Sequence, residues 1–125
     1  MALVGVDTVA VVVADRRRAL AWYRDVLGLV EAFVPPEMGH WIEVGPGRPL
    51  ARLHLCEMGG TTEPGPTGVT ILTDDILAEH ARLSALGVRF LSAPKLEDWG
   101  EWLCSFVDPD GNEFDLKQPA AKMEG

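Results

Sequence analysis

The sequence predicts an α+β fold built from two tandem modules, each of which runs strand, helix and then three strands. An internal repeat predicts this arrangement. Leu27 and Gly28 recur 59 residues later as Leu86 and Gly87, and further along the chain the offset between matching residues is 61. Small insertions in loops account for such a drift, because loops tolerate changes in length better than the elements they connect.

A linker-like stretch separates the two copies. Residues 58–66 hold three glycines and two prolines among nine residues, which is typical of a connecting loop. We therefore expect a single domain, 1–125, that is made of modules 1–57 and 67–118 and ends in a short tail.

In the first module, one helix and four strands follow from residue patterns. The run 4–13 is rich in β-branched valine, which suits a strand. Asp15 then offers a helix cap, apolar residues recur at helical spacing, and Gly28 ends the helix. Further strands are expected at 29–34, 40–44 and 51–56.

The second module repeats this order. Asp74 and Asp75 precede a helix that Gly87 ends. Strands are expected at 68–73, 88–91, 101–107 and 112–118, with a loop at 92–100. The last two strands are joined by Asp-Pro-Asp-Gly at 108–111. It forms a hairpin turn because it supplies a side-chain acceptor, a fixed φ and a glycine in the required order.

Composition and charge limit the classes of function. The chain has 19 acidic and 11 basic residues, a formal net charge of −8 and a pI near 4.7. This balance argues against sequence-independent nucleic-acid binding and favours a cationic or metal-bearing ligand. The sequence has no secretory signal pattern and no apolar run of the roughly 18 residues that a membrane span needs. We therefore expect a cytoplasmic protein with no nucleic-acid or membrane partner. Cys56 and Cys104 lack a C-x-x-C spacing and are expected to be reduced thiols.

Alternation along the last strand of each module selects the candidate site residues. In the first module leucines take one face of this strand, so Arg52 and His54 point the other way. In the second module the same alternation places Glu113 and Asp115 on the polar face. His54 and Asp115 occupy equivalent places in the repeat, and this coincidence favours a site role over two unrelated surface residues.

Three tryptophans lie on or beside expected strands. Trp41 recurs 61 residues later as Trp102, and Trp99 stands among acidic residues at 97, 98 and 101. Aromatic faces and carboxylates suit a planar or cationic ligand. For the repeated pair the alternative is a place in the core, whereas Trp99 has no repeat partner and is the better candidate for a ligand wall.

Three segments, in order on this repeat, resemble the vicinal oxygen chelate superfamily, the group of glyoxalase I, bleomycin resistance proteins, fosfomycin resistance enzymes and extradiol dioxygenases. They are A-L-A-W-Y-R-D-V-L-G-L at 19–29, L-T-D-D-I at 72–76 and D-P-D-G-N-E-F-D-L at 108–116. The resemblance implies that the mixed sheets of the two modules pair into an open cup with the helices outside. It also implies a homodimer and a small organic ligand in the cup.

For metal enzymes of this family the resemblance implies ligands on the first, fourth, fifth and eighth strands. Carried over, these places are Thr8, His54, Gly68 and Asp115. Thr8 is a poor donor and Gly68 has no side chain, so His54 and Asp115 are the expected ligands of a divalent metal of unknown identity. Catalytic sites usually supply three protein ligands. The substitutes available are His40, Glu43 and Glu113.

Three functions remain open from the sequence, and so does the question of whether the protein is an enzyme. The first is a metal-dependent lyase, isomerase or dioxygenase-like enzyme that acts on vicinal oxygens. The second is a metal-free lyase or isomerase with Asp115 or Glu113 as general base and His54 as its partner. The third is sequestration of a cationic or planar drug-like ligand without turnover, as in bleomycin resistance proteins. The residues expected to contact the ligand are Thr8, Trp41, Arg52, Trp99 and Trp102.

Overall fold

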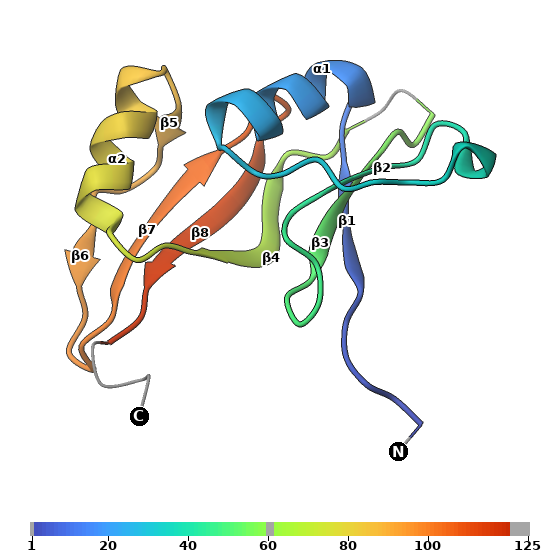
Figure 1. Ribbon diagram of the computed structural model, residues 1–125. Coiled ribbons are helices and arrows are strands. Elements are labelled where there is room, and N and C mark those ends of the chain that lie inside the picture. Colours follow the sequence, from blue (N-terminus) through green and yellow to red (C-terminus); the bar gives the residue numbers. More distant parts are fainter. Residues whose placement is uncertain (1, 60–61, 121–125) are drawn as a thin grey trace. The chain divides into compact units, whose positions relative to one another are not determined.

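The computed structural model describes residues 2–59 and 62–120. The chain divides into two compact units, Met1–Glu63 and Pro64–Gly125. Each unit holds one mixed sheet and one main helix, in the same order along the chain (Figure 1). The predicted α+β class and the tandem order of elements are confirmed.

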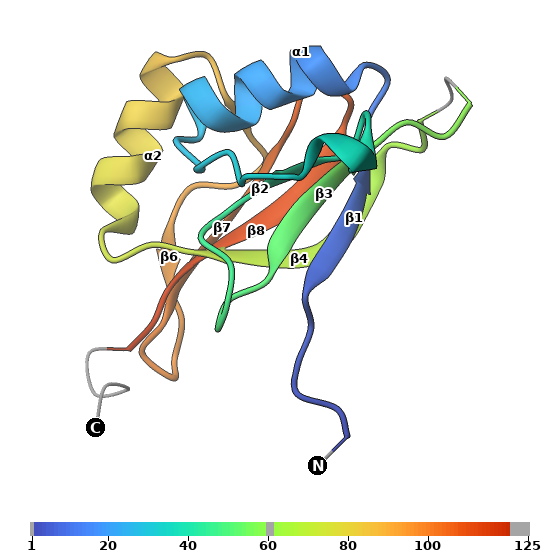
Figure 2. The ribbon, with the colours of Figure 1, turned by 45° about the vertical axis from the view of Figure 1, so that its right-hand side comes forward.

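The first unit is built on a three-stranded sheet of order β1-β3-β2. β3 (Arg52–Cys56) lies in the middle, parallel to β1 (Thr8–Val12) and antiparallel to β2 (Ile42–Val44). Figure 2 shows β1 and β3 side by side. α1 (Arg16–Ala21) continues as a π-helical segment, η1 (Trp22–Val26), and packs against β2 and β3. β1 begins at Thr8 and not at residue 4, although the Asp7 carbonyl still accepts a hydrogen bond of 3.0 Å from the Arg52 N–H of β3.

The strand expected at 29–34 is not present in the structure. Only Glu31 forms a bridge, with Val44 on β2, and a 3-10 turn, η2 (Pro36–Met38), follows. Pro35 and Pro36 lack the backbone N–H that a ladder needs, so pairing cannot continue past this point.

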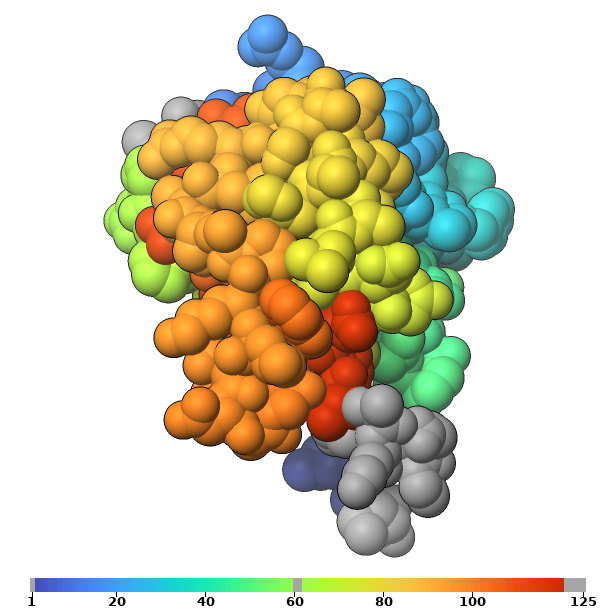
Figure 3. Space-filling view, turned by 90° about the vertical axis from the view of Figure 1, so that its left-hand side faces the viewer, coloured from blue at the N-terminus to red at the C-terminus, as the bar shows by residue number. Residues whose placement is uncertain are grey.

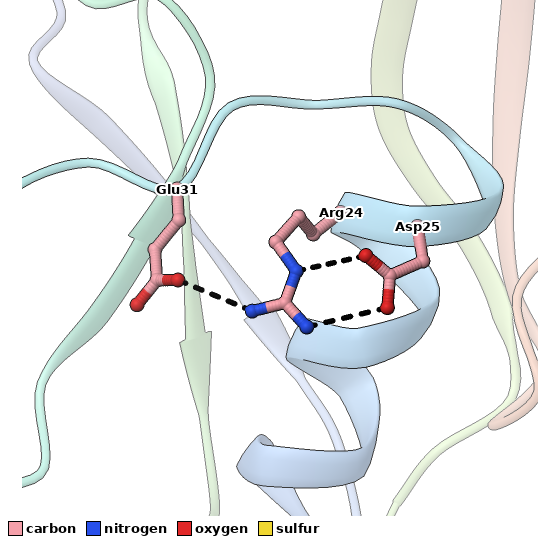
Figure 4. A network of polar contacts seen from close by, with 3 residues as sticks. All are labelled: Arg24, Asp25 and Glu31. Atoms are coloured by element: carbon pink, nitrogen blue, oxygen red, sulfur yellow. Dashed lines mark hydrogen bonds and ion pairs between the residues drawn. The ribbon is translucent and has the colours of Figure 1, made fainter.

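An exposed ionic network joins the end of the first helix to this segment (Figure 4). The Arg24 guanidinium donates to both carboxylate oxygens of Asp25, at 2.9 and 3.2 Å, and to Glu31 at 3.3 Å. These contacts raise the pKa of Arg24 and lower that of Asp25. Because these charged groups are exposed, their contacts add little to the stability of the fold. Their effect is to orient the 29–34 segment relative to the end of the first helix.

The second unit holds a sheet of order β4-β8-β7-β5, with β6 also paired to β7. β4 runs parallel to β8, and the other pairs are antiparallel. α2 (Ile76–Ala85) is capped by Asp75 and contacts β8. Figure 3 shows α2 and the 89–101 segment at the surface of this unit. The strands are β4 (Gly65–Leu72), β5 (Arg89–Phe90), β6 (Lys95–Leu96), β7 (Trp102–Val107) and β8 (Asn112–Gln118).

Two strands of this unit differ from the sequence expectation. β4 begins at Gly65, inside the expected linker, because a bulge between Pro66 and Thr70 lets its first residues pair with β8. β6 lies in the expected loop 92–100, where two residues pair with β7. The hairpin turn at 108–111 is confirmed. Asp108 is 3% exposed, and its carboxylate accepts hydrogen bonds from backbone N–H groups of the residues that follow it.

Each unit has its own core. The alternation predicted for the last strand of each module is confirmed. The leucines of β3 are buried, and so are Phe114 and Leu116 of β8. Cys56 and Cys104 are free thiols, as expected. Burial, with the nearby Asp115 charge, raises the pKa of the Cys104 thiol to about 11. Among the described residues, no helix has the length and apolar character needed to cross a bilayer.

Candidate functional site

The polar face of β3 carries the candidate site of the first unit. His54 points away from the buried leucines of its strand, as the alternation predicts. Its cross-strand neighbours are Glu43 on β2 and Ala10 on β1. Paired residues on adjacent strands share a face, so the Glu43 carboxylate and the His54 imidazole lie on the same side of the sheet.

Trp41 covers His54. The two rings are stacked, with centroids 3.6 Å apart and planes 11° apart. The indole Nε1 donates a hydrogen bond of 2.6 Å to Oε2 of Glu43. The indole is therefore fixed both by a ring beneath it and by a carboxylate at its edge, and it remains 37% exposed.

Arg52 completes this group, which we call the Trp41 cluster: Trp41, Glu43, Arg52 and His54. Nη1 of Arg52 lies 3.7 Å from Oε1 of Glu43. The guanidinium packs on Gly47, where an added Cβ would come within 2.6 to 2.8 Å of its atoms. Gly47 also has a φ of +82°, which glycine adopts without strain. Arg52 thus rests on a loop that requires glycine.

The environment lowers the pKa of His54 below its ordinary value. Burial is the main cause, and the Arg16 charge acts in the same direction, while Glu43 opposes them. The imidazole is therefore neutral at pH 7, since the ordinary pKa of histidine is about 6.5.

This shift predicts a pH dependence of stability. In the unfolded chain His54 binds a proton near pH 6.5, whereas in the folded protein it does so only at lower pH. The unfolded state then binds more protons in this interval, so stability falls as the pH drops below about 6.5. Urea unfolding of the wild type should show a steeper loss between about pH 7.5 and 5.5 than unfolding of His54→Gln. His40→Gln, at an exposed position, is the control, and equal slopes for wild type and His54→Gln would contradict the prediction.

The polar face of β8 carries the candidate site of the second unit. Asp115 is exposed, and its Oδ1 accepts a hydrogen bond of 2.8 Å from Oγ of Ser105 on β7. Thr70 on β4 is its other cross-strand neighbour. A cavity of about 310 Å³ adjoins the Ser105–Asp115 pair and is also bordered by Lys95 and Glu97.

The strand pairing shows which neighbours the other predicted site residues have within each unit. Thr8 lies opposite Arg52, while the neighbour of His54 on β1 is Ala10. Glu113 shares the face of Asp115 but pairs with Val107 beside the turn. His54 belongs to the first unit and Asp115 to the second.

Trp102, one of the expected ligand contacts, lies on the opposite face of the sheet from Asp115. It pairs with Gln118 and shares the face of the buried Cys104, which is the opposite face from Asp115. The reason is a one-residue slip in the repeat. Glu43 faces His54, whereas Ser105 faces Asp115, an offset of 62 and not 61. A slip of one residue moves a strand side chain to the other face.

Trp99, and not Trp102, repeats the contacts of Trp41. Its indole Nε1 donates a 2.8 Å hydrogen bond to Oε1 of Glu101, and Glu101 lies 3.3 Å from Nζ of Lys117. Both units therefore contain a Trp-x-Glu segment whose carboxylate also meets a basic side chain. The sequence analysis missed this second repeat, although the spacing at 41–43 and 99–101 was its visible signal.

The two expected ligands of a divalent metal belong to different units, His54 to the first and Asp115 to the second. Within residues 2–59 and 62–120, no three His, Cys, Asp or Glu side chains come together as a ligand set. Glu43, a possible substitute ligand, is already bonded to Trp41, and Asp115 is bonded to Ser105. Catalytic metals usually take three protein ligands, and metal binding by His54 and Asp115 stays a prediction.

Comparison with known proteins gives consistent results. A family model described as Glyoxalase/Bleomycin resistance protein/Dioxygenase superfamily matches residues 5–116. No curated protein sequence matches the chain significantly. A solved superfamily member from Sphaerobacter thermophilus DSM 20745 has 27% identity and a TM-score of 0.84, with 95% of this chain and 100% of that chain covered.

Two solved proteins from Streptomyces sp. CB03234 are more similar in sequence. TnmS3, described as an antibiotic binding protein, has 35% identity and a TM-score of 0.80, and the match covers 96% of this chain and 99% of TnmS3. A glyoxalase/bleomycin resistance protein has 33% identity and a TM-score of 0.74, with 91% of this chain and all of that chain covered.

Proposed function

Because the chain belongs to the Glyoxalase/Bleomycin resistance protein/Dioxygenase superfamily, we propose that it sequesters a planar, aromatic, drug-like molecule without changing it chemically. The observation that carries the proposal is the Trp41 cluster, in which a half-exposed indole is held in place by His54 and Glu43. Similarity to an antibiotic binding protein at 35% identity supports the same function.

An indole fixed before binding suits this function. A side chain that is already immobile loses little conformational entropy when a ligand arrives, so more of the contact energy appears as affinity. Stacked aromatic pairs also contribute about 0.5–1.5 kcal/mol beyond the area that they bury. The open face of Trp41 therefore offers a flat ligand a favourable contact at low entropic cost.

The alternative lyase or isomerase would use Asp115 or Glu113 as general base, with His54 as its partner. Oδ1 of Asp115 accepts a hydrogen bond from Ser105, and Glu113 pairs with Val107 beside the turn. A general base must lie within hydrogen-bond reach of a substrate proton. Sequestration requires no general base. It depends instead on the contacts that hold Trp41 in place within the Trp41 cluster.

We also expect the protein to act as a homodimer in the cytoplasm, as the family resemblance and the sequence suggest. Exposed apolar side chains of the first unit, among them Leu3, Val4 and Phe33, support self-association. Light scattering and cell fractionation test these two expectations.

Binding of shape-matched probes tests the proposed function. Anthracene-2-carboxylate, 2-aminomethylanthracene and 2-hydroxymethylanthracene share one flat ring system, and their binding is followed by fluorescence anisotropy. At least one should bind with a micromolar or lower Kd, and Trp41→Ala should weaken it about 10- to 100-fold, as loss of a stacking partner does.

The control variant is Leu77→Ala, at a 56% exposed position on α2, which should bind like the wild type. Mass spectrometry of the recovered probe should show it unchanged. Absence of binding by all three probes, or their conversion to product, would refute sequestration at this surface.

A further inference from the structure

Arg52 is the least satisfied polar group of the Trp41 cluster. A guanidinium carries five N–H donors. Its contact with Glu43 is an ion pair at 3.7 Å, which is longer than a hydrogen bond. Nε is buried and has no hydrogen-bond partner in the described part of the chain. An acceptor from solvent does not reach this buried atom, but the Arg52 side chain is 34% exposed, so its other N–H groups are the ones that a ligand meets.

Glu43, in contrast, is already occupied. Its Oε2 accepts the Trp41 indole N–H at 2.6 Å, and its Oε1 faces Arg52. The Glu43 side chain is 14% exposed, whereas that of Arg52 is 34% exposed. A ligand at this surface therefore meets a cation more readily than an anion, although the whole chain carries a net charge of −8.

The position of Arg52 suits a ligand stacked on Trp41. Arg52 and His54 alternate on β3, so both face the same side, with about 7 Å between their Cα atoms. Trp41 lies over His54, and the Arg52 guanidinium packs against Gly47. A flat ring on the indole then places its substituents within reach of a guanidinium that is already held in place.

We infer that the ligand carries an anionic oxygen, as in an aromatic carboxylate or phenolate, next to its ring system, and that Arg52 binds this oxygen. The inference rests on the function proposed above and assigns a ligand class to the same surface. It differs from the expectation of a cationic ligand, which followed from net charge alone. Guanidinium and carboxylate match in geometry, because two parallel N–H groups can meet two oxygens.

The three anthracene probes test the inference, because they share one ring system and carry substituents of similar size but different charge. The wild type should bind the carboxylate at least 10-fold more tightly than the aminomethyl compound. Arg52→Gln should abolish this preference. Arg52→Lys keeps the charge but lacks the planar fork, so it should retain only part of the preference. Urea unfolding of each variant confirms that it is folded before binding is measured.

A matched control comes from the neighbouring loop. Arg48, whose side chain is 85% exposed, carries the same charge, and Arg48→Gln should keep the full preference for the carboxylate. Equal binding of the carboxylate and aminomethyl probes, with both weakened by Trp41→Ala, would overturn the role of Arg52 and leave sequestration standing. A preference for the aminomethyl probe would also overturn it. Failure of every probe to bind the wild type would refute both proposals.

Discussion

Phe114→Ala should lower the free energy of unfolding by about 3–5 kcal/mol, the usual cost of truncating a buried phenylalanine. Phe114 is 1% exposed and stacks on Phe106 of the neighbouring strand, with ring centroids 5.7 Å apart. Its removal leaves a cavity between β8 and α2 that rigid strands cannot close. Equilibrium urea unfolding, followed by circular dichroism, measures the loss.

The control for this prediction is another phenylalanine. Phe33 is 84% exposed, so Phe33→Ala removes the same atoms without opening a cavity, and it should change the free energy of unfolding by less than about 0.5 kcal/mol. Similar losses in the two variants would show that Phe114 does not lie in a packed core.

Asp108→Ala should cost about 3 kcal/mol, although it removes no apolar contact. Asp108 is 3% exposed, and its Oδ1 accepts from the backbone N–H groups of Asp110 and Asn112 at 2.9 and 2.8 Å. Its Oδ2 accepts from Nδ2 of Asn112 at 2.8 Å. Alanine removes the acceptor of these three hydrogen bonds, and loss of a partner from a buried hydrogen bond costs about 1–3 kcal/mol.

Asparagine at this position separates the contributions of the two oxygens. Asp108→Asn keeps one oxygen as acceptor for the backbone N–H groups, but its NH2 group then faces the NH2 group of Asn112, and both are donors. Its free energy of unfolding should therefore lie between those of the wild type and Asp108→Ala. Asp98→Ala, at an exposed position, serves as the control. Equal stability of Asp108→Ala and wild type in urea unfolding would contradict the assigned role of the turn.

The parts of the fold that could be predicted depend on local patterns. The helix caps at Asp15 and Asp75, the turn at Asp108 and the two-faced alternation of β3 and β8 are all properties of a few neighbouring residues. The strand expected at 29–34 and the short β6 are different, because each depends on which distant segment offers a free edge. Residue patterns alone do not specify that partner.

The candidate site shows the same division. The faces of His54 and Asp115 could be predicted from alternation, and Trp41 does lie on the face of His54. The face on which Trp102 lies could not be predicted, because a repeat offset cannot resolve a slip of one residue. The packing of Arg52 against Gly47 could not be predicted from the sequence, because it depends on the conformation of the loop between β2 and β3.

The two-faced character of β3 has a consequence for how this protein could change over evolutionary time. The buried leucines of β3 alternate along one strand with Arg52 and His54, which we propose to lie at the ligand surface, and the two sets point to opposite faces. Substitutions at 41, 52 and 54 can therefore alter what is recognised while the leucines between them keep the module folded. Such a separation makes the scaffold evolvable: new specificities are accessible through a few exposed positions, without a compensating change in the interior.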